Sequence, residues 1–152
     1  MTKTLSTVKT RRALAADAED IAGLLAVLGY PANTMEVTAR MERFDQSDTS
    51  ILIVAEIGER IVGVASGQLV PSIHDSALVG QLTGLVVDTA FQKRGVGAAL
   101  TEVVENWVSE NGAARITLTS ASHREGAHAF YEGLGYKRTG VRLAKSLPGA
   151  RS

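Results

Sequence analysis

The first third of the chain carries one strand-like and two helical patterns. Residues 8–14 mix β-branched and basic residues and predict a strand. Apolar residues then recur at intervals of three and four from Asp17 to Leu28, the spacing of an amphipathic helix that Gly29 would end. Its acidic residues cluster at the start, where the helix dipole favours anions. A weaker helical pattern covers Thr34 to Phe44.

Three strands and a long helix are predicted in the middle of the chain. Residues 51–70 hold two β-branched runs on either side of Gly58-Glu59, which indicates a hairpin. Residues 77–88 predict a further strand, in which Gly84 indicates a bulge or a close backbone approach. A helix of about 27 Å is predicted from Arg94 to Asn111. We expect its apolar stripe to be core rather than a cofactor site: Leu100, Val103, Val104, Trp107 and Val108.

The last third predicts a buried strand over residues 114–120 and a short helix from Glu125 to Glu132. One or two short strands are expected over residues 136–147. Helices and strands therefore follow one another in a mixed order, which predicts a three-layer α/β (mixed α+β) domain. We expect a single domain over residues 1–152, with a core from about 8 to 147.

Composition narrows the function classes. Sixteen basic residues balance sixteen acidic ones, and this zero net charge argues against a nucleic-acid-binding protein. No apolar run is long enough to span a membrane, and no apolar segment of a secretory signal follows the N-terminal cations. The absence of cysteine excludes disulfides, thiolate zinc sites and a cysteine nucleophile. We expect a cytoplasmic protein with no membrane partner, no nucleic-acid partner and no metal.

A glycine loop is the strongest local motif. Gln92-Lys93-Arg94-Gly95-Val96-Gly97 lies between a predicted strand and a predicted helix. Free N–H groups at a helix start attract anions, and glycine lets a phosphate approach the backbone. A nucleoside triphosphate loop would need Lys-Ser/Thr after its last glycine, whereas Ala98-Ala99 follow here. A dinucleotide-binding fold needs the longer pattern G-x-G-x-x-G near its first strand, whereas this loop has only G-x-G. The remaining alternative is a strand-to-helix turn that uses glycine for its geometry alone.

A second motif, about thirty residues after the glycine loop, helps to choose among these interpretations of the loop. The segment from Glu125 to Gly140 reads EGAHAFYEGLGYKRTG. Together with the loop, this chain resembles the GNAT superfamily of N-acetyltransferases over about residues 8–147. The family's Q/R-x-x-G-x-G/A loop is matched by Gln92, Gly95 and Gly97. Its A-x-x-F-Y-x-x-x-G-F/Y element is matched by five residues: Ala127, Phe130, Tyr131, Gly135 and Tyr136.

The resemblance implies a fold and a donor. The fold would be a central, mixed, mostly antiparallel sheet of six to seven strands with about four helices, splayed where acetyl-CoA binds. The loop amides would bind the pyrophosphate, and the preceding strand would pair its backbone with the pantetheine arm. The residues implied in donor binding are Leu85, Val86, Val87, Gln92, Lys93, Arg94, Gly95, Val96, Gly97, Ala98, Arg124 and Phe130.

The implied chemistry is direct attack of an amine on the thioester in a ternary complex. Tyr131 matches the family's tyrosine. A phenol with a pKa near ~10 is within a couple of units of a thiol at about 8.5, so it can hydrogen-bond or protonate the departing CoA thiolate. Many members carry a glutamate base at the register of Thr83-Gly84, and here neither residue is a base. Ordered water, His74, Asp75 or His123 are the alternatives. Arg124 stands where many members have asparagine.

Three functions remain at this point. The leading one is an acetyl-CoA-dependent N-acetyltransferase acting on a primary amine of a small molecule, peptide or protein. The second is an acyl-CoA-binding regulatory module without transfer activity, and the third is a nucleotide-binding protein that uses the same loop. Neither the acceptor nor the acyl-chain preference follows from the sequence. A homodimer is allowed, because Gly140–Leu147 reads as a strand that could extend a second copy's sheet.

Overall fold

A computed structural model describes residues 7–119 and 125–149 of the chain. It divides into two compact units, residues 1–118 and 119–152, which are described separately below. The prediction of a single domain stays a prediction. None of the described helices has the length and apolarity needed to span a bilayer.

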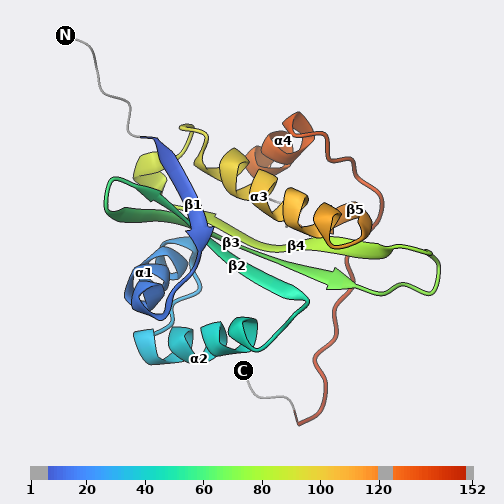
Figure 1. Ribbon diagram of the computed structural model, residues 1–152, viewed down its shortest axis with the longest axis horizontal. Helices are drawn as coiled ribbons and strands as arrows, with labels where there is room; N and C mark the ends of the chain where they lie inside the picture. Colours follow the sequence, from blue (N-terminus) through green and yellow to red (C-terminus); the bar gives the residue numbers. More distant parts are fainter. Residues whose placement is uncertain (1–6, 120–124, 150–152) are drawn as a thin grey trace. The chain divides into compact units, whose positions relative to one another are not determined.

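The first unit is built on a five-stranded sheet (Figure 1). Its strands lie in the order β1-β2-β3-β4-β5, and all neighbours are antiparallel except β4 and β5, which are parallel. The mixed, mostly antiparallel sheet is thus confirmed, with fewer strands than the six to seven expected. The strands are β1 (Val8–Arg12), β2 (Ser50–Ile57), β3 (Arg60–Val70), β4 (Leu78–Val87) and β5 (Ala113–Leu118).

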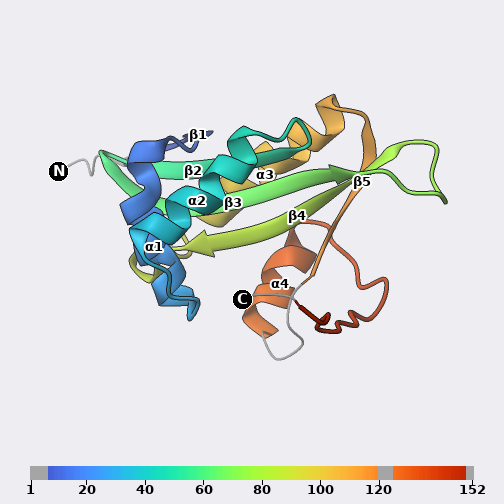
Figure 2. The ribbon, with the colours of Figure 1, turned by 90° about the horizontal axis from the view of Figure 1, so that it is seen from below.

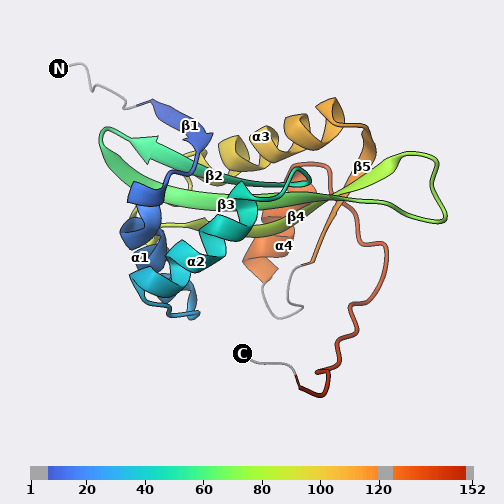
Figure 3. The same cartoon turned by 60° about the horizontal axis from the view of Figure 1, so that its bottom comes forward.

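Helices cover both faces of this sheet. On one face lie α1 (Ala18–Leu28) and α2 (Thr34–Asp45), and on the other lies α3 (Val96–Glu110), as Figures 2 and 3 show from two sides. Gly29 ends α1 with φ +93°, as its position predicts. The core under α1 and α2 joins helix and strand residues: Ile21, Leu24, Val37, Met41, Val54, Val64 and Val86.

The second unit contains one described helix, α4 (Glu125–Gly133), which confirms the short helix predicted there. The strands expected over residues 136–147 are absent from the described part of this unit. Val141, Leu143 and Leu147 are exposed at 87%, 90% and 67%. The apolar alternation of this segment is present in the sequence, but a strand also needs a neighbour for its backbone ladder.

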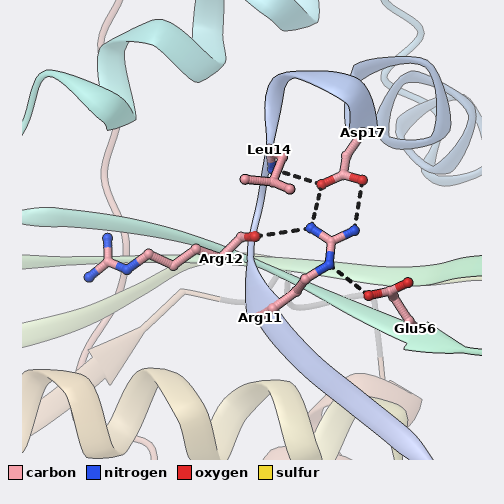
Figure 4. Close-up of polar contacts among 5 residues, drawn as sticks. All are labelled: Arg11, Arg12, Leu14, Asp17 and Glu56. Carbon is pink, nitrogen blue, oxygen red and sulfur yellow. Dashed lines mark hydrogen bonds and ion pairs between the residues drawn. The ribbon is translucent and has the colours of Figure 1, made fainter.

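Arg11 ties the edge strand to the first helix (Figure 4). Its guanidinium makes two parallel bonds to the Asp17 carboxylate at 2.8 and 2.9 Å, and its Nε donates to Glu56 on β2 at 2.6 Å. Asp17, only 6% exposed, also accepts from the backbone N–H of Leu14 at 2.7 Å. Asp17 therefore lies near a helix start, as expected, but its main partner is a side chain of β1. The Arg11 hydrogen bonds hold the pKa of Asp17 below its ordinary value.

A row of glycines lets α3 lie almost on the backbone of the sheet. Val96, Leu100, Val104 and Val108 follow one another at four-residue spacing and are at most 3% exposed. A Cβ atom on Gly63 would lie 2.9 Å from Leu100, and one on Gly67 would lie 2.5 Å from Val104. On Gly80 it would lie 2.7 Å from Cβ of Val108. Each glycine thus faces the helical stripe, and a Cβ on Gly63 would also lie 3.0 Å from Val96.

The glycine row predicts a clash at Gly80. In Gly80→Ala the new methyl group would meet the Val108 Cβ, which no side-chain rotation can move, so we expect a loss of about 1–3 kcal/mol of unfolding free energy. Urea unfolding of Gly80→Ala, Val108→Ala and the double variant measures it. The double variant should lose less than the two single losses together, because Val108→Ala removes the γ-methyl contacts at 2.7 and 2.9 Å and leaves only the Cβ contact. Gly23→Ala on α1, where a Cβ has open space, is the control.

The Arg11–Asp17 pair predicts an acid-dependent loss of stability. Because the pKa of Asp17 is lowered in the folded protein, its contribution is complete above the unfolded-state pKa of about 3.9 and is lost as pH falls through the folded value. We expect Asp17→Asn to cost about 1–3 kcal/mol at pH 7 and less at pH 3. Denaturant unfolding from about pH 2.5 to about pH 7 measures this dependence. Asp20→Asn, on the exposed side of α1, is the control, and an equal pH slope in both variants would contradict the assignment.

Candidate active site

The open edge of β4 is the first component of the site. Its pairing with β5 ends at Leu82 and Leu118, while pairing with β3 continues to Val87. Residues 83–87 therefore have a strand neighbour on one side only within the described chain. Figure 2 shows β4 running on past β5 toward its arrowhead. Backbone N–H and C=O groups on this open side need another partner, and an extended ligand with amide groups would supply one.

A bulge at Thr83 sets which side chains line this edge. Ser66 pairs with Gly84 and Gly67 with Leu82, so Thr83 is the extra residue of β4. Its hydroxyl lies 2.7 Å from that of Ser66, and a Cβ on Gly84 would lie 2.9 Å from the same Ser66 oxygen. The bulge expected at Gly84 is therefore confirmed one residue earlier, at Thr83, and the atom close to Gly84 belongs to a side chain rather than to the backbone.

The loop after β4 ends in an uncapped helix start. A short 3-10 turn, Thr89–Phe91, leads to Lys93 at φ +64° and Gly95 at φ +83°. The first helical bond of α3 runs from Ala99 N–H to the Gly95 carbonyl at 3.0 Å, so the preceding amides have no helical acceptor. No side chain caps this end and no acidic residue lies in its first turn. In α2, by contrast, Asn33 and Glu36 form a complete capping box.

The positive charges beside this helix start include one that the sequence analysis missed. Arg94 lies over the ring of Phe91 at 5.2 Å, and Arg60 lies over the same ring at 5.1 Å. Arg60 begins β3 and also bonds Asp88 at 3.0 Å. The sequence does contain a signal for Arg60, because in a β2–β3–β4 meander the first residue of β3 lies beside the end of β4. Arg60 follows the Gly58-Glu59 turn directly.

The predicted donor-binding residues of the first unit lie along one continuous path. Leu85 and Val87 are half-buried on β4, whereas Val86 is 7% exposed and packs in the core with α1. Val96 is 1% exposed beneath α3. Val86 and Val96 can therefore offer only backbone groups to a ligand. The side chains of Gln92, Lys93 and Arg94 are exposed, and Gly97 and Ala98 lie half-buried in the first turn of α3.

The predicted residues of the second unit lie on α4. Tyr131 makes edge-to-face contacts with Phe130 at 5.1 Å and with Tyr136 at 5.8 Å. Burial raises the pKa of the Tyr131 phenol above its ordinary value. The hydroxyl therefore keeps its proton throughout the neutral range, as a proton donor must. Arg124, which was also predicted to bind the donor, lies outside the described residues.

One of the candidate bases, Asp75, is weakened by its partner. Asp75 pairs with Arg115 on β5 at 3.0 Å, and this bond, with help from Ser72, lowers the pKa of Asp75. Thr83 is engaged with Ser66. His74 lies in the loop between β3 and β4, and His123 lies outside the described residues. Within the described chain, no group of three acidic or histidine side chains could hold a metal ion.

Trp107 differs from the expected pattern. Leu100, Val104 and Val108 are core as predicted, but Val103 and Trp107 are only half-buried because the stripe is centred on four-residue spacing. Trp107 instead lines a pocket of about 350 Å³ with Arg12, Phe44 and Asp48. This pocket lies near the C-terminal end of α3, and the glycine loop lies at the N-terminal end.

Known proteins share both the sequence pattern and this fold. A model of the acetyltransferase (GNAT) family matches residues 18–136. N-acetyltransferase 8 from Homo sapiens is 30% identical over 89 residues, which cover 57% of this chain and 38% of that relative. The chain thus spans less than half the length of this relative.

Solved structures agree on the fold. A transcriptional regulator from Bacillus halodurans matches with a TM-score of 0.86 at 26% identity, over 93% of this chain and 100% of that one. An aminoglycoside N-acetyltransferase in complex with CoA also matches with a TM-score of 0.86, at 20% identity, over 97% of this chain and 99% of that one.

The backbone of Gly95 predicts a graded response to substitution. A Cβ there meets no atom within 4 Å, so the cost of a side chain comes only from φ +83°. We expect Gly95→Ala to lower the unfolding free energy by about 1–2 kcal/mol and Gly95→Asn by less, since asparagine tolerates the left-handed region. Chemical denaturation of both variants measures the difference. Equal losses would show that the loop relaxes to another conformation.

Proposed function

The chain belongs to the acetyltransferase (GNAT) family, and we propose that it transfers an acetyl group from acetyl-CoA to a primary amine. The acceptor would be a small molecule, a peptide or a protein. The supporting observation is the continuity of the site. An open strand edge, residues 83–87, leads through a short loop into a helix start that has no cap and is flanked by cations.

This path suits the donor in both shape and charge. The amide-bearing pantetheine arm can add to the open edge of β4 as a short strand would. The pyrophosphate can then accept from the free N–H groups of Val96, Gly97 and Ala98, with Gly95 as the preceding turn. Lys93 and Arg94 supply positive charge at the rim, while Gln92 and Leu85 to Val87 border the path. Phe130 and Arg124 are proposed contacts that rest on the family resemblance.

The proposed reaction is a direct displacement. The amine nitrogen forms a bond to the thioester carbonyl carbon, the carbon–sulfur bond breaks, and the CoA thiolate leaves. A backbone N–H of β4, at Val86 or a neighbour, would polarise the carbonyl oxygen. Tyr131 would hydrogen-bond the leaving sulfur and donate its proton to it, and ordered water would then return a proton to the phenol. The raised pKa of the Tyr131 phenol keeps this group protonated at neutral pH before the reaction.

The amine must lose a proton, and no described side chain is assigned this role. Asp75 is held in an ion pair and is a weak base, so ordered water or an amine that arrives neutral fits the site better. The chain has no cysteine, which excludes a cysteine acyl-enzyme. Catalysis would come mainly from holding the two reactants together.

The oligomeric state and the location of the protein are further proposals. A homodimer is supported by the exposed apolar side chains of Val141, Leu143 and Leu147, which a second copy could cover. A cytoplasmic location stays a prediction from the sequence.

Thiol release tests the function directly. The protein has no cysteine, so a thiol reagent reports only the CoA set free. Acetyl-CoA would be offered with aminoglycosides, amino sugars, amino acids, polyamines and peptides. Acceptor-dependent release is the expected result. Binding of acetyl-CoA without release from a broad panel would favour a regulatory module, and a thermal shift with ATP or NAD but none with CoA would favour a nucleotide-binding protein.

The role of Tyr131 has its own test. Removing the phenolic proton in Tyr131→Phe should lower kcat about 10²-fold or more while the KM for acetyl-CoA changes about twofold or less. Steady-state thiol release with the best acceptor measures both. Tyr30→Phe, at an exposed tyrosine, is the matched control. Full turnover by Tyr131→Phe would remove Tyr131 as the acid.

A further inference from the structure

Arg60 and Arg94 share one aromatic platform beside the glycine loop. Both guanidinium carbons lie about 5 Å from the centre of the Phe91 ring, so they are within about 10 Å of each other, close to the Debye length of physiological salt. Lys93 adds a third cation between Phe91 and Gly95. The Asp88 carboxylate is the acidic group that Arg60 contacts. The platform therefore keeps a surplus of positive charge.

Arg60 is held in place but retains free donors. Asp88 accepts from one Arg60 nitrogen through Oδ2 and from the Ala90 N–H through Oδ1, both at 3.0 Å. The carboxylate is thus fixed by the turn that it caps. Arg60 makes no other side-chain hydrogen bond among the described residues. A guanidinium has five N–H donors, and stacking on a ring leaves its edge available for a phosphate.

The direction of β4 indicates which phosphate reaches Arg60. The open edge runs from residue 83 to residue 87, and Val87 pairs with Gly63 near the start of β3, where Arg60 lies. If pantetheine follows this edge to the loop, the nucleotide end of CoA emerges beside Arg60 and Phe91. The ribose at that end carries a separate 3′-phosphate. In the proposed complex the N–H groups at the start of α3 already bind the pyrophosphate, so they are not available to this phosphate.

We infer that Arg60, positioned by Asp88 and Phe91, binds the 3′-phosphate of CoA together with Arg94. This inference rests on the proposed function, because it assigns one end of the same donor. Because Arg60 begins β3, the β2–β3 hairpin would then help to select the donor. The protein should then distinguish CoA from its 3′-dephospho form, which is otherwise chemically identical.

Calorimetric titration with CoA and with 3′-dephospho-CoA tests the assignment. In Arg60→Gln the Kd for CoA should rise about fivefold to tenfold, the size of one exposed charge-assisted hydrogen bond, while the Kd for 3′-dephospho-CoA stays within about twofold. The matched control is Arg115→Gln. It removes an arginine from a second exposed ion pair of 3.0 Å, with Asp75 near the other end of β4. Thermal unfolding of both variants checks that the fold is retained.

The outcomes separate this inference from the proposed function. If the unsubstituted protein binds neither ligand, the donor assignment itself fails. If it binds both equally, or if Arg60→Gln weakens both by the same factor, Arg60 does not read the 3′-phosphate. A selective loss for CoA that appears also in Arg115→Gln would indicate a general charge effect and would overturn the assignment to Arg60.

Discussion

Helix α3 packs so closely on β3 and β4 that a side chain at three glycines of these strands would meet it. Gly63, Gly67 and Gly80 have no side chains to hold the helix away, so the stripe from Val96 to Val108 rests almost on the backbone of β3 and β4. Interiors pack at crystal-like density and do not deform continuously. The helix therefore has one depth and one position along the strands, and its first turn is fixed relative to the end of β4.

That fixed relation makes the strand edge and the helix start parts of one site. Neither is specific alone: open strand edges and uncapped helix ends both occur without ligands. Here the chain passes from one to the other within eight residues, from Val87 to Gly95, with two cations and an aromatic ring on the way. Arg60 reaches the same place from a different element, and its bond to Asp88 joins residues 28 positions apart in sequence. The positive charge is thus assembled by the loop and the sheet together.

The sequence predicts most helices and strands of the first unit because their patterns are local. Gly29 ends α1 as predicted, and the Gly58-Glu59 turn lies between β2 and β3. Helix α3 begins at Val96 rather than Arg94, because Gly95 turns into the left-handed region. The glycine row could not be predicted, since it depends on how α3 packs on the strands, and Arg60 could be placed only by assuming that β3 and β4 are neighbours. The strands predicted over residues 136–147 failed for the same reason: alternation is local, but pairing is not. The resemblance to a family supplied the candidate residues on α4, and burial adds the raised pKa of Tyr131.

The bulge at Thr83 determines which side of the sheet the residues at each end of β4 face. Gly80 faces α3 and Val86 packs with α1, although six positions separate them and a regular strand would put both on one face. The single extra residue inverts the facing of everything after it. Deleting Thr83 would turn the Val86 side chain toward α3 and the side chain of the following residue toward α1. Insertions and deletions at this position are therefore not neutral length changes, and an alignment with any relative must place its gaps on the correct side of Thr83 to keep the two halves of β4 in phase.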